Sequence, residues 1–132
     1  YLGQGKPGDV KAFWPELVEV VAWIVAAGGV AILAHPLKYQ LTRSKLRRLV
    51  ADFKAADGAG LEILNGRQTQ EQSRQLRLLA VEFGLEVSGG SDFHHDTAWG
   101  AELGVELHHL GGLSGVWRRW LPSEGCAAGE PL

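Results

Sequence analysis

Asp92 and His94 are the residues best suited to chemistry in this chain of 132 residues. They stand two positions apart, after a short, mainly apolar run and two glycines. In an extended segment, residues i and i+2 point the same way, so the carboxylate and the imidazole would face one point. Such a pair favours a divalent metal such as zinc, manganese or iron. The alternative is that both side chains only make hydrogen bonds within a turn.

His35 is a third candidate ligand, far upstream in the sequence. It lies between Ala34 and Pro36, directly after the apolar run 30–33. Both motifs stand where a strand is expected to end, and α/β enzymes carry their chemistry at the carboxyl ends of strands. If the strands are parallel neighbours, the three candidate ligands meet at one edge of the sheet. The alternative for His35 is a structural role in a proline turn.

The hydrophobic pattern predicts helices and strands that alternate along the chain. Helices are expected at 15–27, 42–56 and 69–83, and strands at 30–34, 61–64 and 85–88. Each helix has apolar residues at helical spacing and is followed by glycine, and Thr42 is a candidate N-cap. This order predicts an α/β fold with parallel strands, either open or curved into a barrel. Three strands are too few to close a barrel alone. Residues 107–121 are expected to form a packing loop with one helical turn, followed by a flexible tail at 122–132.

Composition limits the class of protein. The hydrophobic fraction of 45% predicts a folded domain, and the net charge of -2 gives no general attraction to nucleic acid or membranes. No apolar run is long enough to span a bilayer. The single cysteine, Cys126, excludes an intramolecular disulfide and favours a reducing compartment such as the cytoplasm. Because the chain lacks Met and opens in a glycine-rich stretch, we expect it to be part of a longer protein.

Several further residues could contact a substrate. Lys38 and Arg43 lie between the His35 strand end and the next helix, where free backbone N–H groups and the helix dipole favour a phosphate. Glu62 lies inside a predicted strand and either faces the site or pairs with a neighbour. The tryptophans are expected in the core or at an interface. Weaker candidates are the loop or motif-adjacent residues Lys6, Asn65, Arg67, His95, Asp96, His108 and His109.

Taken together and in order, these motifs resemble the PHP (polymerase and histidinol phosphatase) family, and more closely its TrpH/YciV-like branch. The resemblance covers roughly residues 1–121. The sequences that carry it are residues 1–8, Ala34-His35-Pro36 with Tyr39, residues 41–49, Gly60-Leu61-Glu62, and Gly90-Ser91-Asp92-Phe93-His94.

The resemblance implies that residues 1–121 are the C-terminal part of a distorted (β/α)7 barrel. It implies up to three divalent metals (manganese, zinc, iron or magnesium), with His35, Asp92 and His94 among the ligands and the remainder contributed by a missing N-terminal half. It also implies a hydrolase that removes the 3′-phosphate from nucleoside 3′,5′-bisphosphates such as pAp and trims short RNA from the 5′ end. The expected nucleophile is a metal-bound hydroxide, and Lys38 and Arg43 would bind substrate. No membrane partner is implied.

Departures from the family pattern bear on the substrate. Leu37-Lys38-Tyr39 stands where the family usually has Gly-Arg-Tyr, and Lys38 keeps the charge without the bidentate geometry of arginine. Gln68-Thr69 stands where many relatives have His-Thr, and Asp9 where they have an aromatic residue. Because early ligands of the family would precede residue 1, the isolated chain is expected to bind metal weakly and to be nearly inactive. Two alternatives remain: a phosphatase for another small monoester such as histidinol phosphate, and a non-catalytic RNA-binding module.

Overall fold

The computed structural model describes residues 5, 7, 13–66, 68–94, 102–110 and 112–121, without the side chains of residues 108 and 109. Most of residues 1–12, which the sequence predicts to form a loop, and the whole predicted tail at 122–132 lie outside the described residues. So do four of the weaker site candidates: Lys6, Arg67, His95 and Asp96.

A parallel three-stranded sheet forms the centre of the described structure. Its strands are β1 (Ile32–Leu33), β2 (Gly60–Asn65) and β3 (Glu86–Gly90), in the order β1-β2-β3. The helix α1 (Leu17–Ala26) precedes β1, while α2 (Arg43–Ala55) and α3 (Gln70–Phe83) connect successive strands. Parallel neighbours need such crossover connections. The predicted α/β fold with parallel strands is therefore confirmed.

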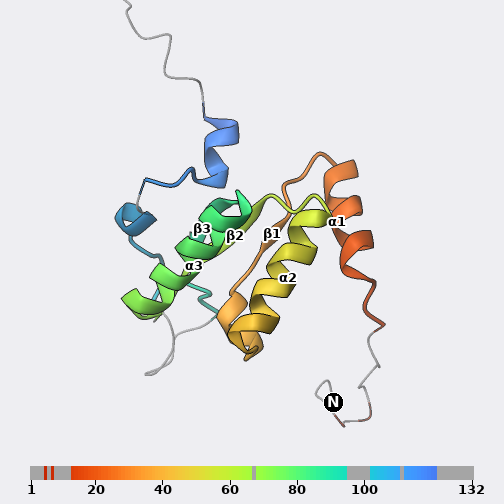
Figure 1. Cartoon of the computed structure of the whole chain (residues 1–132), viewed down its shortest axis with the longest axis horizontal. Helices are drawn as coiled ribbons and strands as arrows, with labels where there is room; N and C mark the ends of the chain where they lie inside the picture. Colours follow the sequence, from red (N-terminus) through yellow and green to blue (C-terminus); the bar gives the residue numbers. More distant parts are fainter. Residues whose placement is uncertain are drawn as a thin grey trace, which may run out of the picture.

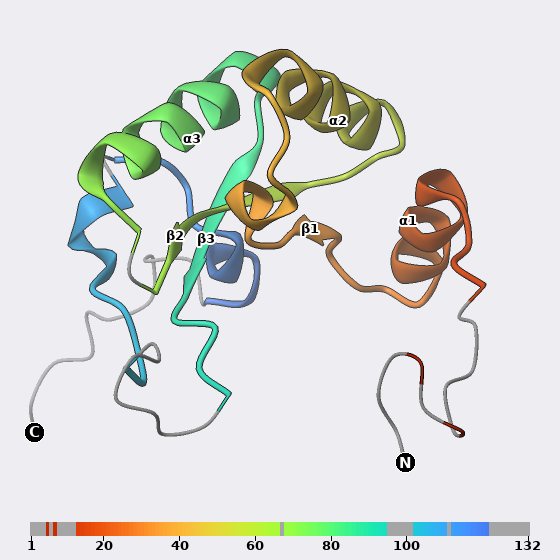
Figure 2. The ribbon, with the colours of Figure 1, turned by 90° about the horizontal axis from the view of Figure 1, so that it is seen from below.

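Helices α2 and α3 lie side by side over one face of the sheet (Figures 1 and 2). The short 3-10 helix η3 (Val116–Trp120) packs against the opposite face, where a Cβ added to Gly60 would collide with Val116. The core between these layers contains almost fully buried aliphatic side chains, each contributing roughly 1.5–3 kcal/mol by burial. They include Val50, Leu61, Ile63, Leu76 and Val87. This packing fixes the carboxyl ends of the strands relative to one another.

Capping residues determine where the helices α1 and α2 begin. Thr42 is the N-cap of α2, as predicted, because its hydroxyl accepts from the Lys45 backbone N–H at 3.4 Å. Helix α1 begins at Leu17 rather than at Pro15, because Glu16 is the N-cap and its N–H donates to the Glu19 carboxylate at 3.1 Å. Pro15 therefore lies before the helix and not in its first turn.

Two predictions about the ends of the fold need correction. Strand β1 has two residues instead of five, because its pairing with β2 begins only at Ile32 and the backbone turns left-handed at His35, directly after Ala34. The C-terminal region has two 3-10 helices, η2 (Leu107–Leu110) and η3, instead of one helical turn.

The edge of the sheet near α1 is the least covered part. In the described part of the chain, β1 pairs only with β2, and α1 lies beyond β1 (Figure 2).

Of the tryptophans with described side chains, Trp117 packs on the core, but Trp14, Trp23 and Trp120 are exposed. The prediction of a core position is therefore wrong for these three tryptophans, while an interface role for them stays a prediction. None of the described helices has the length and apolar character needed to cross a membrane.

Candidate metal and phosphate site

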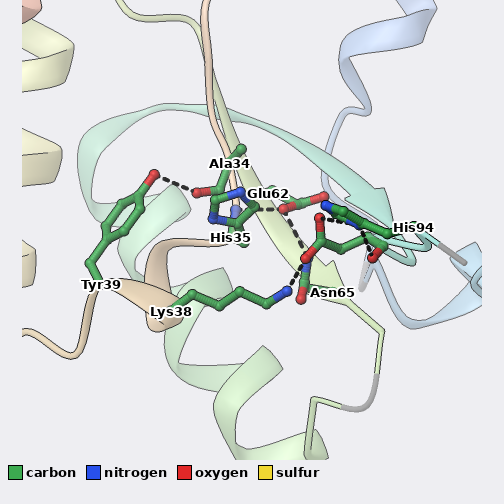
Figure 3. Close-up of polar contacts among 8 residues, drawn as sticks. Ala34, His35, Lys38, Tyr39, Glu62, Asn65 and His94 are labelled. Atoms are coloured by element: carbon green, nitrogen blue, oxygen red, sulfur yellow. Dashed lines mark hydrogen bonds and ion pairs between the residues drawn. The ribbon is translucent and has the colours of Figure 1, made fainter. Parts of the chain in front are cut away.

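The carboxyl ends of the three strands bring the candidate residues together (Figure 3). His35 follows β1, Glu62 belongs to β2, and Asp92 and His94 follow β3. The Lys38 ammonium forms an ion pair with the Asp92 carboxylate, so the segment after β1 contacts the segment after β3. The structure thus brings residues from distant parts of the sequence to one edge of the sheet.

His35 has an unusual backbone and an unusual environment. Its φ of 32° and ψ of 54° place it in the left-handed region, which residues other than glycine rarely adopt. Its ring packs edge-on against Tyr39, with ring centres 5.8 Å apart. The Nδ1 atom is buried and has no hydrogen-bond partner among the described residues. A buried polar atom without a partner is unfavourable by about 1–3 kcal/mol, whereas an imidazole nitrogen is a good donor to a metal.

Asp92 and His94 approach each other through a turn and not through an extended segment. Asp92 has a φ of 54°, so the premise that this segment is extended is wrong. The His94 Nδ1 lies 2.9 Å from the Asp92 carbonyl oxygen and 3.8 Å from the carboxylate Oδ1. An Nδ1–H that donates to a backbone carbonyl leaves Nε2 free to bind a metal, which is the usual arrangement of histidine ligands. The carboxylate of Asp92 is mostly buried, while the His94 side chain is exposed.

Tyr39 stabilises the turn that follows β1. Its hydroxyl donates to the Ala34 carbonyl oxygen at 2.7 Å (Figure 3). Burial raises the pKa of Tyr39, and the negative charge of Glu62 raises it further. The phenol therefore remains a neutral hydrogen-bond donor across the physiological pH range.

Glu62 both faces the strand ends and pairs with neighbours, so the two alternatives from the sequence are not exclusive. It accepts from the His35 backbone N–H and from the Asn65 side chain. Asn65 therefore lies at the mouth of the site. No three or more His, Cys, Asp or Glu side chains are grouped to hold a metal ion within the ranges that the structure describes.

Two pockets open beside this edge. The first, of about 340 Å³, is lined by Leu37, Lys38, Asn65, Gly66, Gln68, Gln72 and Ser91. The second, of about 500 Å³, shares three of these residues and extends toward Arg77 and residues 102–106. Lys38 thus lines a pocket, whereas Arg43 is exposed as the first residue of α2 and is not among the described lining residues.

Sequence reasoning missed the residues of α3 that line the two pockets, such as Gln72 and Arg77. The N-cap signal at Thr69, which places Gln72 in the first turn of α3, was the available clue. Gln68, which the sequence analysis named, donates to the Ile63 carbonyl at 2.7 Å and to the Ser73 hydroxyl at 2.8 Å and so fixes the loop after β2. His108 and His109 lie in η2, and their side chains are outside the described part of the structure.

Known bacterial proteins are similar in sequence to most of this chain. No protein-family model matches the chain. The chain is 44% identical over 120 residues to a 5′-3′ exoribonuclease of Haemophilus influenzae, covering 91% of this chain and 43% of the relative. It is 42% identical over 104 residues to a 3′,5′-nucleoside bisphosphate phosphatase of Chromobacterium violaceum, covering 79% of this chain and 36% of the relative.

The chain is similar to phosphoester hydrolases. A solved structure of an amidohydrolase from Chromobacterium violaceum, with bound sulfate and no metal, matches 90% of this chain and 41% of its own, with 37% identity and a TM-score of 0.70. These names and this structure fit a PHP-type phosphoesterase. The chain spans less than half the length of these relatives.

Proposed function

We propose that the protein is a metal-dependent phosphoesterase of the TrpH/YciV-like branch. It removes the 3′-phosphate from pAp-like nucleoside 3′,5′-bisphosphates and trims short RNA from the 5′ end, in the cytoplasm. The observation that carries the proposal is the similarity, at 42–44% identity, to a bisphosphate phosphatase and an exoribonuclease. The chain would form the C-terminal part of a (β/α)7 barrel, and its coverage of only 36–43% of the relatives' length supports its being one part of such a domain.

His35, Asp92 and His94 would be ligands of divalent metals (manganese, zinc, iron or magnesium) together with residues of the N-terminal half of the barrel, since in the described part of the chain the three are not grouped into a complete site on their own. Support comes from the buried, unpartnered His35 Nδ1 and from the His94 ring, whose Nδ1 lies within hydrogen-bond distance of a backbone carbonyl. A bound metal would activate water and polarise the phosphoryl group. With three ligands at this edge, the rest of the set for up to three metals would come from the N-terminal half of the barrel.

Lys38 and Arg43 would bind the substrate phosphate. Lys38 lines the pocket of about 340 Å³ and already contacts a carboxylate there. An ammonium in that position can equally donate charged hydrogen bonds to phosphate oxygens. Arg43 would act from the first turn of α2, where the helix dipole also favours an anion.

The deciding experiment is phosphate release from pAp with added manganese, comparing the full-length parent protein, which includes the N-terminal half of the barrel, with its Asp92→Asn variant. We expect turnover that the substitution abolishes, because the amide is a poor metal ligand. Asp52→Asn, on the exposed face of α2, is the matched control and should keep full activity. Turnover of histidinol phosphate instead of pAp would replace pAp with histidinol phosphate as the assigned substrate. RNA binding that survives EDTA, without any turnover, would replace catalysis with a binding function.

A further inference from the structure

Glu62 lies where the ends of all three strands meet (Figure 3). Its Oε2 accepts from the His35 backbone N–H at 2.5 Å, after β1, and from the Asn65 side chain at 3.3 Å, at the end of β2. Its Oε1 faces Gly90 at the end of β3, where an added Cβ would lie 3.0 Å from that oxygen. One carboxylate therefore accepts hydrogen bonds at two strand ends and faces the third.

The contact with His35 acts on the backbone and not on the imidazole. A left-handed conformation at a residue other than glycine is unfavourable by about 1–3 kcal/mol and persists only where the surroundings hold it. A short hydrogen bond from a backbone N–H to a carboxylate is stronger than one between neutral groups. The bond from His35 to Glu62 thus opposes the strain at the residue that carries the buried, unpartnered Nδ1.

We propose that Glu62 is a positioning residue for the metal site. It holds the His35 backbone in the left-handed conformation and so orients the imidazole at the strand ends. Gly90 supports this role because any larger residue would press on the Glu62 carboxylate. The inference rests on the proposed function, since it takes His35 to be a metal ligand, and it adds a residue that acts through that ligand.

Two pairs of variants separate the acceptor role from the charge and from general crowding. Both hydrogen bonds fall on the same oxygen, so Glu62→Gln can keep them through its amide oxygen, while Glu62→Ala loses them. Gly90→Ala displaces the carboxylate without removing it. Gly89→Ala is the matched control, because its Cβ would meet Leu107 and Leu64 at 3.2 Å on the other side of the strand.

The first measurement is the NMR amide proton shift of His35 in the metal-free protein, and the second is the affinity for Mn²⁺ alone, from the electron spin resonance of free Mn²⁺. We expect Glu62→Ala to move the His35 amide upfield and to weaken Mn²⁺ binding roughly 10- to 100-fold, the usual effect of removing a group that orients a metal ligand. Glu62→Gln should lie between the parent protein and Glu62→Ala in both measurements, because it keeps the acceptor but loses the charge. Gly90→Ala should change the His35 amide shift and the Mn²⁺ affinity in the same direction as Glu62→Ala. Gly89→Ala should change neither quantity.

The two measurements also distinguish this inference from the proposed function. An unchanged His35 amide in Glu62→Ala overturns the inference, and so does unchanged Mn²⁺ affinity in a folded variant. A loss in Glu62→Gln as large as in Glu62→Ala overturns the acceptor role and assigns the effect to charge. If the parent protein binds no Mn²⁺ while the His35 amide shift responds as expected, the proposal of a metal site is wrong, but the positioning of the His35 backbone by Glu62 is supported.

Discussion

Replacing Lys38 by methionine tests whether this residue binds substrate or only stabilises the fold. Lys38 makes an ion pair with Asp92 and lines the pocket at the strand ends. Methionine keeps an unbranched apolar side chain of similar length and removes only the charge. The substitution therefore separates the ammonium from the packing of its stem.

The expected effects on stability and on activity differ in size. The Lys38 side chain is 53% exposed and that of Asp92 is 20% exposed, so their pair is close to a surface ion pair, worth about 0.2–1 kcal/mol. The free energy of unfolding should thus fall by less than about 1 kcal/mol. A charged hydrogen bond to a phosphate oxygen is worth about 1.5–3 kcal/mol, which corresponds to a loss of roughly 10- to 150-fold in kcat/KM.

The assay combines urea unfolding with kcat/KM for pAp in the presence of Mn²⁺. Lys38→Arg should keep most of the activity, because it keeps the charge and presents its N–H donors in a geometry that suits bidentate binding of phosphate. Arg48→Met is the matched control, since Arg48 pairs with Asp52 at 3.9 Å on the exposed face of α2. It should leave kcat/KM unchanged.

The reasoning is refuted by either of two results. A loss of more than about 2 kcal/mol in the free energy of unfolding would exceed a surface ion pair and give Lys38 a structural role. Unchanged kcat/KM in a folded Lys38→Met variant would remove it from the substrate site.

Two further predictions concern the core and the turn after β1. Leu76 is fully buried in α3, so Leu76→Ala should lower the free energy of unfolding by about 2–5 kcal/mol, whereas Val81→Ala on the exposed side should change it by less than about 0.5 kcal/mol; equal effects in urea titrations would contradict the assigned helix faces. Burial and Glu62 raise the pKa of Tyr39, so its ultraviolet titration, isolated by subtracting Tyr39→Phe, should have a midpoint above the usual value of about 10 and move down in Glu62→Gln. Because the folded protein then holds this proton more tightly than the unfolded chain, stability should fall as pH rises from the unfolded pKa to the folded pKa; a midpoint at or below the ordinary value would show that partial burial and Glu62 do not raise the pKa of Tyr39.

The regular elements were predictable because local sequence determines them. The stripe of Leu46, Val50 and Phe53 specifies the buried side of α2, and Thr42 specifies its beginning. The alternation of these elements was enough to predict parallel strands and the edge of the sheet near which His35 and Asp92 both lie.

The conformation of the site residues was not predictable in the same way. His35 and Asp92 are left-handed, although nothing in their own residue types requires it. At His35 the cause is a contact with Glu62, which is 27 residues away in the sequence. The apolar run at 30–34 likewise predicted a longer strand, because the pattern does not contain the turn that ends β1 early. Tertiary contacts therefore decided the features on which the candidate chemistry depends.

The succession of the strands has a consequence for the order of folding. Ile32 pairs with Gly60 and Gly60 pairs with Glu86, so only one helix and its connections separate two paired strands in the sequence. Contacts of such modest sequence separation form faster than long-range ones. The ion pair between Lys38 and Asp92 spans 54 residues and requires both units to be in place. The candidate site therefore forms only when the two β-α-β units have joined, and pulsed hydrogen exchange should show protection of β1 and β2 before protection around Asp92.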